Sequence, residues 1–379
     1  MATQPQAQQA QKKPAQQPIK YSASGGLVGF LAAQNLSFVF SSYQSGKFYL
    51  IGRNPKGGIV VNERFFQKAM GIHVADRETI YLATLAQILK FTNTLDDNQK
   101  INNAHDTCYV PRVSYTTGAL DAHDVGVLSN GEIIFVNTRY NCLATVSETR
   151  SFKPVWKPHF IDKIVGEDRC HLNGMAMEDG RAKYVTAVSK SNTIDGWRDR
   201  RADGGIIMDV EKNEIILEGL SMPHSPRMYN GKLYVLNSGT GELGWVEVGK
   251  TAAESKFHPI AFCPGFVRGV AFHGKYAFVG LSKPRYERFE GLALDQKLKD
   301  ADSEPWCGVQ VIDLETGSVT QWFRMDGPIA ELYDVGVIAG AQTPMALGFA
   351  NADVVKLVTH EAEGSLPAAP TKKAAKSKK

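Results

Sequence analysis

The sequence contains few cysteines, and they are not arranged as a metal-binding or redox motif. Five are present, an odd number, and no two stand in a CxxC spacing. No hydrophobic signal segment precedes them, which argues against export by that route. We therefore expect a reduced, cytoplasmic setting.

The sequence also lacks a long apolar run. No stretch approaches the roughly 20 apolar residues that a helix needs to cross a bilayer, so no membrane span is predicted. Apolar residues nevertheless make up 43% of the 379 positions. A chain of this length and composition can bury the core of one large domain or two ordinary ones.

Excess positive charge is absent from the body of the chain. The formal net charge is +4, but eight lysines lie at the two ends, so positions 21–371 hold 35 basic and 39 acidic residues. Nucleic acid is therefore not an expected partner of the folded part.

A pair of short strands joined by a glycine turn recurs along the sequence. Its clearest copy is 121–138, where Val, Ile and Phe suit strands and Asn130-Gly131 accepts the positive φ angles of a tight hairpin. Further copies lie at 170–186, 224–237 and, more weakly, 268–279. The turn glycines are spaced 49, 51 and 43 residues apart, which is typical of four-stranded propeller blades.

These repeats predict an all-β fold, a six-bladed β-propeller. Its inner strands are expected near His73, His123, Asn173, His224, Arg268 and Asp334. The strands between positions 38 and 66 have no blade of their own, so we expect them to pair with the last segment, 331–338, and close the ring. A charged insertion at 284–306 is expected to form a short helix over one face of the disc.

The ends of the chain are expected to lie outside this domain. Residues 1–20 are almost entirely Gln, Ala, Pro and Lys, and 359–379 are rich in Lys and Ala. Such compositions bury too little apolar surface to offset the entropy of ordering the chain. The domain prediction is thus a single propeller at 21–358 between two disordered tails.

Six segments resemble the signature of a known family. They are 137–144, 168–174, 219–227, 236–243, 264–269 and 280–283. The family comprises conserved hypothetical bacterial proteins, a domain of unknown function sometimes attached to tetratricopeptide repeats, and the resemblance covers roughly 36–350. It implies a propeller-like fold and leaves the chemistry open.

The architecture is also similar to that of six-bladed lactonases and lyases that bind a divalent metal in the central channel. This is an analogy between folds. The glutamate, asparagine and aspartate ligand set of the lactonases is not evident in this sequence.

Three histidines are the candidate metal ligands: His123, His171 and His224. Each stands near the start of an inner strand, where the loops of a propeller converge on one mouth of the channel. Neutral imidazoles, with Asp124 or Asp121 behind them, would suit Zn²⁺, Fe²⁺, Mn²⁺ or Cu²⁺.

The alternative is that each histidine only bonds a backbone group where its strand begins. The three stand 8, 9 and 7 residues before their turn glycines. Side chains alternate between the two faces of a strand, so a difference of one residue can change where a side chain points.

Two arginines and two asparagines are candidate ligand-binding residues, together with Asp124. Arg227 and Arg268 belong to neighbouring repeats and could direct guanidinium groups at a carboxylate or phosphate. Their alternative role is to pair between blades with Glu331 or Asp334. Asn173 and Asn237 could orient a ligand, or hold turns, which is the commoner use of asparagine.

The remaining candidates lie at the rim. The loop 196–205 combines Trp197 with three arginines and is either part of a pocket rim or a solvated turn. Lys283 and Arg285 could hold an anionic ligand, or form a charged turn. Adjacent strand residues face opposite ways, which disfavours a thiol nucleophile at Cys170 activated by His171.

Two functions follow from these candidates. The first is binding of a small anionic molecule or peptide, or of a divalent metal, in the central channel, as in a metal-assisted hydrolase or lyase. The alternative is a non-catalytic scaffold that presents the disc face to a peptide or protein partner.

The metal hypothesis predicts that the protein carries a transition metal when it is purified without an affinity tag. Elemental analysis measures this directly. Less than about a tenth of an equivalent would contradict a resident centre built from three histidines.

Overall fold

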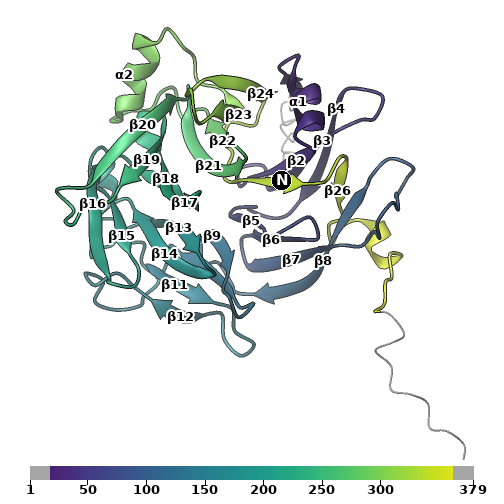
Figure 1. Cartoon of the computed structure of the whole chain (residues 1–379). Helices are drawn as coiled ribbons and strands as arrows, with labels where there is room; N and C mark the ends of the chain where they lie inside the picture. The colour runs from purple at the N-terminus through teal and green to yellow at the C-terminus, as the bar shows by residue number, and fades with distance from the viewer. Residues whose placement is uncertain (1–17, 362–379) are drawn as a thin grey trace, which may run out of the picture.

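The structure, a computed structural model, describes residues 18–361. Its strands form six sheets set around a central axis like the blades of a propeller (Figure 1). The predicted six-bladed β-propeller is therefore confirmed.

The blades are numbered here in the order in which their second strands occur along the chain. Each is given from its inner to its outer strand. Blade 1 is β25 (Val335–Ala339), β2 (Leu36–Ser42), β3 (Lys47–Arg53) and β4 (Ile59–Phe65); blade 2 is β5 (Ile72–Val74), β6 (Thr79–Ala83), β7 (Gln87–Asn93) and β8 (Thr107–Thr116); blade 3 is β9 (Ala122–Val127), β10 (Ile133–Asn137), β11 (Cys142–Thr145) and β12 (Lys153–Trp156). Blade 4 is β13 (Leu172–Glu178), β14 (Arg181–Ala187), β15 (Gly205–Asp209) and β16 (Glu214–Leu220); blade 5 is β17 (Pro223–Tyr229), β18 (Lys232–Asn237), β19 (Glu242–Glu247) and β20 (Lys256–Phe262); blade 6 is β21 (Phe266–His273), β22 (Tyr276–Ser282), β23 (Cys307–Asp313) and β24 (Val319–Asp326).

The predicted positions of the inner strands are also confirmed. Five of the six marker residues lie in the inner strands of blades 2 to 6, and Asp334 directly precedes the inner strand of blade 1. The inner strands of neighbouring blades contact one another around the axis (Figure 1).

The turns between first and second strands follow two patterns. At Asn230-Gly231 both residues have positive φ, 47° and 74°, as a type I′ hairpin requires. At Asn130-Gly131 only the glycine has a positive φ, 82°, and the Asn130 side chain accepts a hydrogen bond from the backbone N–H of Glu132. The hairpin itself was predicted correctly. The expectation that both turn residues have positive φ was wrong at Asn130-Gly131.

The ring is closed by strands from the two ends of the chain. β25 pairs antiparallel with β2, with Leu36 opposite Ala339 and Phe40 opposite Val335. Phe38 and Phe40 are fully buried in a core that they share with Phe323 of blade 6. The closure predicted from the sequence is therefore confirmed, and it joins blade 1 to blade 6 by packing.

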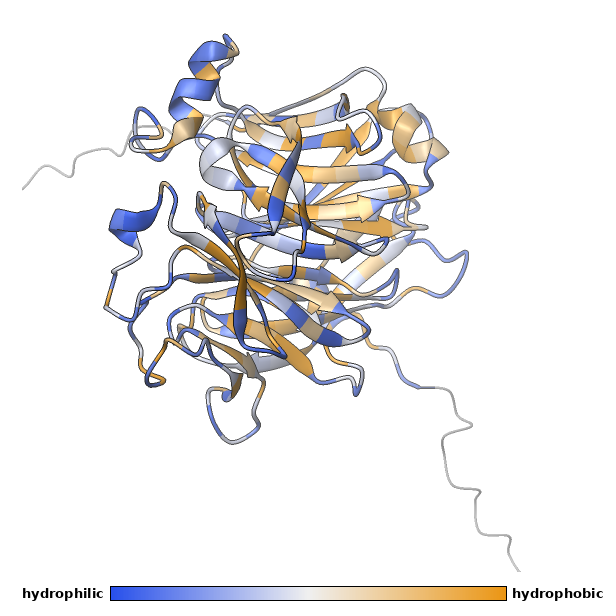
Figure 2. Cartoon of the chain, turned by 60° about the vertical axis from the view of Figure 1, so that its left-hand side comes forward, coloured by the Kyte–Doolittle hydropathy of each residue, from blue (hydrophilic) through white to orange (hydrophobic). Residues whose placement is uncertain are grey.

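Each junction between neighbouring blades encloses a hydrophobic core. The six cores draw their buried side chains from blades 6 and 1, 1 and 2, 2 and 3, 3 and 4, 4 and 5, and 5 and 6. Seen from the side, apolar residues fill the strands while much of the loop chain is hydrophilic (Figure 2). A blade thus buries both faces only when it has a neighbour on each side.

Several short elements decorate the ring. They are β1 (Lys20–Ala23), which pairs with β24; β26 (Pro344–Ala346), which pairs parallel with β8; the helices α1 (Leu27–Ala33) and α2 (Ala293–Asp300); and the 3₁₀ helices η1 (Arg198–Arg200), η2 (Ser238–Thr240) and η3 (Ala352–Val355). The helix expected in the insertion 284–306 is α2. Lys20 of the first predicted tail belongs to β1, whereas 1–17 and 362–379 lie outside the described residues.

All five cysteines are buried free thiols. In the part of the chain that the structure describes, no helix is both long and apolar enough to cross a membrane. The cytoplasmic location stays a prediction.

The closing strand gives a first test of stability. Phe40→Ala removes a fully buried ring at the junction of blades 1 and 6. We expect it to lower the free energy of unfolding by about 3–5 kcal/mol. Phe65→Ala in the same blade, where the side chain is 64% exposed, is the matched control and should change it by less than about 1 kcal/mol. Equal effects in urea denaturation would contradict this account of the closure.

Candidate functional site

Four blades each place a residue with left-handed backbone in the segment leading to the inner strand. These residues are Lys68, Asp121, His171 and Met222, with φ of 54°, 53°, 51° and 47°. All four line the same cavity. Non-glycine residues in this region cost free energy and cluster at functional sites, so the repeated geometry marks this mouth of the channel.

The cavity has a volume of about 1180 Å³. Lys68, which donates a hydrogen bond to Asp121, joins Met70, His123, His171, Arg268 and Tyr333 in its lining. The loop from Trp197 to Arg201 and the insertion from Lys283 to Leu292 also line it. Of the rim candidates, Trp197, Lys283 and Arg285 therefore lie at the cavity.

His123 and His224 occupy equivalent positions in their blades. In each, ring Nδ1 lies 2.8 Å from the carbonyl oxygen of the residue two before it, Asp121 or Met222. The backbone role considered for the histidines therefore holds for these two rings.

His171 occupies a different position, two places earlier relative to the left-handed residue of its blade, so that Asn173 is the counterpart of His123 and His224. His171 is itself the left-handed residue, and its Nδ1 lies 2.6 Å from Oδ2 of Asp168. The spacing to the turn glycine does not by itself decide where a histidine points, because His123 and His224 differ by one residue in that spacing yet make the same backbone contact.

Aromatic rings form an arc along the cavity lining. The ring centroid of His171 lies 4.2 Å from that of Trp197 and 5.0 Å from that of His123, which lies 5.4 Å from that of Tyr333. The structure thus brings His123 and His171 together. His224 packs instead edge-on against Phe266, at 5.4 Å, and is not among the lining residues.

Burial keeps two of the histidines neutral. It lowers the pKa of His123 to about 3, with the neighbouring His171 adding to the effect. Burial likewise lowers the pKa of His224 well below its usual value, and the charge of Arg268 contributes. Neither ring carries a charge near neutral pH.

The described residues do not fit a centre of three histidines. Within 18–361, no group of three or more His, Cys, Asp or Glu side chains could hold a metal ion. His224 packs edge-on against Phe266 and, unlike His123 and His171, does not line the cavity. We derive no chemistry through a metal, and metal binding stays a prediction.

Arg227 is held between carboxylates on the inner strands. Its Nη1 and Nη2 donate to Asp124 at 2.6 and 3.2 Å, Nη1 also donates to the Met175 carbonyl, and Nη2 lies 3.7 Å from Asp334. The inter-blade pairing considered for this arginine is present, with Asp124 as the main partner. Neither Arg227 nor Asp124 lines the cavity, and a role for them in ligand binding stays a prediction.

Arg268, in contrast to Arg227, is not hydrogen-bonded to a carboxylate of the described residues. Among residues 18–361 its guanidinium makes no hydrogen bond, and its closest carboxylate contact is Glu331, 3.6 Å away. The rings of Phe266, Tyr333 and Tyr43 surround it, with centroids 5.0, 5.6 and 5.8 Å from the guanidinium carbon. The predicted pairing with Glu331 is therefore long, and Arg268 remains available to the cavity.

Glu331 is engaged by other partners. Its two oxygens each accept a hydrogen bond from Nε of Arg285 at 3.0 Å, and the Tyr43 hydroxyl donates to it as well. A carboxylate that is already bonded in this way competes weakly for Arg268.

The two asparagines hold neighbouring segments. Nδ2 of Asn173 donates to the Pro223 carbonyl at 2.9 Å, and Oδ1 of Asn237 accepts from the N–H of Ser221 at 2.7 Å. This is the turn-holding role considered for them. Neither lines the cavity, and ligand binding by either stays a prediction.

Three donors around the cavity have no acceptor. The buried atoms Nε1 of Trp197, Nε of Arg268 and Oη of Tyr333 lack a hydrogen-bond partner in the described part of the chain. Burial raises the pKa of Tyr333 well above its usual value, so its hydroxyl keeps the proton. Tyr333 was missed from the sequence, because nothing in its local pattern indicates that it meets Arg268 and His123.

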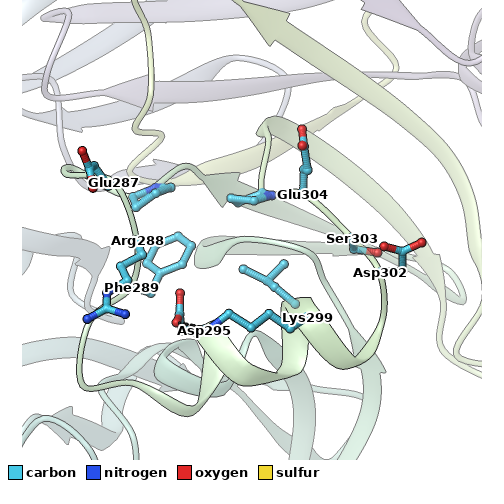
Figure 3. A pocket seen from close by; sticks show the side chains of 11 residues that line it. Glu287, Arg288, Phe289, Asp295, Lys299, Asp302, Ser303 and Glu304 are labelled. Atoms are coloured by element: carbon cyan, nitrogen blue, oxygen red, sulfur yellow. Dashed lines mark hydrogen bonds and ion pairs between the residues drawn. The ribbon is translucent and has the colours of Figure 1, made fainter.

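A second, smaller cavity lies beside α2. It has a volume of about 220 Å³, and Figure 3 shows the charged side chains of Glu287, Arg288, Asp295 and Lys299 around it. Lys299 pairs with Asp295, and Arg288 with Glu290, each at 3.1 Å. Only the Asp295–Lys299 pair lies within this lining, because Glu290, the partner of Arg288, lines the central cavity instead.

Comparison with known families agrees with the resemblance seen in the sequence. The family described as a domain of unknown function (DUF4915) matches residues 25–347. No curated protein matches the chain. An attachment to tetratricopeptide repeats stays an expectation.

Solved structures with similar arrangements share little sequence with this chain. The nidogen/laminin complex matches with 10% identity and a TM-score of 0.47, covering 80% of this chain and 99% of the other. A virginiamycin B lyase from Staphylococcus aureus matches with 11% identity and a TM-score of 0.38, covering 81% and 99%. A putative gluconolactonase matches with 8% identity and a TM-score of 0.39, covering 69% and 90%. Likenesses at this level carry no argument about chemistry, and both the enzyme and the scaffold functions stay predictions.

Asp334 provides a test of the inner ion network. Burial raises its pKa to about 7, and the charge of Asp124 adds to this while Arg227 opposes it. The folded protein thus keeps this proton up to about pH 7, whereas the unfolded chain loses it near pH 4. Between these values the folded state binds more protons, so the contribution of Asp334 to the free energy of unfolding falls as pH rises.

Asp334→Asn removes this contribution. We expect the stability of the variant relative to the wild type to increase from pH 4 to pH 7 and to level off above it. The depressed pKa of His123 acts in the opposite direction but is common to both proteins, so it cancels in the difference. Urea denaturation at several pH values measures this, and parallel stability curves would contradict a raised pKa at Asp334.

Proposed function

This chain belongs to the family described as a domain of unknown function (DUF4915), and we propose that it binds a small anionic ligand in its central cavity. The observation that carries the proposal is the set of buried donors without acceptors. Nε1 of Trp197, Nε of Arg268 and Oη of Tyr333 all belong to residues that line this one cavity.

Unsatisfied buried donors are costly, and a group of them calls for an explanation. Each buried donor without an acceptor destabilises a protein by roughly 1–3 kcal/mol. Nε1 of Trp197 and Nε of Arg268 can only donate, and the Tyr333 hydroxyl can also donate, so a molecule with several acceptor oxygens would complement all three. A carboxylate or phosphate has this character.

Arg268 is the anchor for the negative charge. Its guanidinium offers five N–H donors in a planar fork; Nε has no partner among the described residues, and Nη1 makes only the 3.6 Å contact with Glu331. The side chain is only 11% exposed, and aromatic rings limit its contact with water. A charge-assisted hydrogen bond is strengthened in such surroundings.

The rest of the cavity complements the anchor. Seven basic side chains line the cavity against five acidic ones, and Arg198, Arg201 and Arg285 belong to the basic set. Met70, Met222 and Phe289 offer apolar surface to a carbon skeleton. The volume of about 1180 Å³ is slightly above the range of roughly 300–1,000 Å³ that is usual for small-molecule sites.

Removing the anchor tests the proposal. We expect the wild type to bind at least one of inorganic phosphate, succinate and citrate in calorimetric titrations at low ionic strength. Arg268→Gln should weaken that binding by about 10- to 150-fold, which corresponds to the roughly 1.5–3 kcal/mol of a charged hydrogen bond.

Arg181→Gln is the matched control, because Arg181 is exposed at the start of β14 and does not line the cavity. It should leave both binding and the thermal midpoint unchanged. Equal affinity in the wild type and the Arg268 variant, or no binding of the three anions by the wild type, would contradict the proposal.

A further inference from the structure

The three candidate histidines, His123, His171 and His224, differ in the group that ring Nδ1 contacts. Nδ1 of His123 and of His224 faces a backbone carbonyl, at 2.8 Å in both cases. Nδ1 of His171 faces the carboxylate of Asp168, at 2.6 Å. A carboxylate can stabilise the imidazolium that forms when a ring takes up a proton, and a carbonyl does so far less.

We propose that His171 is the general base of the central cavity, and that Asp168 is the residue that positions it. The inference rests on the proposed function, because it needs an anionic substrate held in the same cavity. It goes further by assigning a reaction class, the removal of a proton from the carbon next to a bound carboxylate.

Asp168 holds His171 through two contacts. Its Oδ1 accepts the backbone N–H of His171 at 3.0 Å, and its Oδ2 accepts the ring Nδ1–H. With the proton on Nδ1, the lone pair of the ring lies on Nε2, for which the described residues offer no hydrogen-bond partner. The ring is 14% exposed and lines the cavity.

The local backbone serves this placement. His171 has a left-handed φ of 51°, and its ring packs against Trp197, tilted by 32°, with centroids 4.2 Å apart. Rings fixed by both packing and a hydrogen bond keep the orientation that proton transfer requires. His123, held neutral by burial, lies 5.0 Å away on the other side.

The proton transfer balances without a further reactant. The C–H bond of the substrate breaks, and its proton binds Nε2 of His171, giving an imidazolium beside the Asp168 carboxylate. The electron pair passes into the bound carboxylate as an enediolate, whose charge is met by the donors of Arg268 and Tyr333. While it is on Nε2 this proton can exchange with solvent, and its return to the carbon restores the carboxylate and leaves His171 neutral, so the net reaction is exchange of that hydrogen.

The first test measures the lone pair on Nε2. Diethyl pyrocarbonate modifies imidazoles at an unprotonated nitrogen, and peptide mass spectrometry gives the rate for each histidine. We expect His171 to react faster than His123 or His224. Asp168→Asn presents an amide N–H to Nδ1 and shifts the ring proton to Nε2, so the rate at His171 should fall by at least about tenfold.

Two controls separate positioning from folding. Asp203→Asn, an exposed Asp in the following loop that does not line the cavity, should leave the rate at His171 unchanged. Asp168→Glu restores a carboxylate and should recover part of the rate. Thermal midpoints establish that the variants are folded.

Nitrogen NMR of the wild-type protein tests the same claim without a substitution. It should show His171 with its proton on Nδ1 and Nε2 unprotonated. A proton on Nε2, or an indifference of His171 reactivity to Asp168→Asn in a folded variant, overturns the proposal.

Inorganic phosphate distinguishes this inference from the anion site on which it rests. Phosphate should protect His171 of the wild type from modification, and Arg268→Gln should abolish that protection. If His171 is reactive and depends on Asp168 but phosphate neither protects it nor binds, the positioning of His171 by Asp168 stands, while the anion site fails and the reaction class that needs it is overturned. If phosphate binds through Arg268 but His171 is unreactive, the anion site stands and the base is overturned.

Discussion

The structure depends on the requirement that every blade has a neighbour on both sides. A four-stranded sheet with two apolar faces cannot stand alone in water, and each junction here encloses its own core. Pairing β25 with β2 supplies the last junction and brings the two ends of the chain into one sheet. Closing the ring also removes edges that would otherwise pair with other chains.

Ring closure has a second consequence, because it directs the inner strands toward one axis. Residues that are more than a hundred positions apart then meet, as Asp124 and Arg227 do in a buried ion pair. The network satisfies its own charges through backbone and side-chain contacts. The cavity at the mouth is different, since Arg268, Tyr333 and Trp197 keep donors that no described residue satisfies. Buried atoms without a partner also occur away from the cavity, at Arg64 and Trp156 among others, but three of them belong to residues that line this one cavity.

Candidate residues were predicted well where their placement depends on neighbours in the sequence, and poorly where it depends on contacts between distant segments. The repeats placed His123, His224 and Arg268 correctly on inner strands, because glycine turns and alternating apolar residues are visible in the chain itself. The contact of His171 with Asp168 was missed, since it joins residues three places apart through the left-handed backbone at His171. The sequence pattern Asp-x-x-His at a strand start is the signal that could have indicated it.

By itself, the sequence determined the all-β class, the number of blades, the inner strands and the pairing of the two ends. These follow from hydrophobic alternation and turn chemistry, which act between near neighbours, and from the count of strands left without partners. Only the tertiary structure decided which polar groups are satisfied. Arg227 and Arg268 look alike in the sequence, yet Asp124 engages the first while Glu331, held by Arg285, leaves the second free. Such competition depends on distances across the axis, and no local pattern encodes those distances.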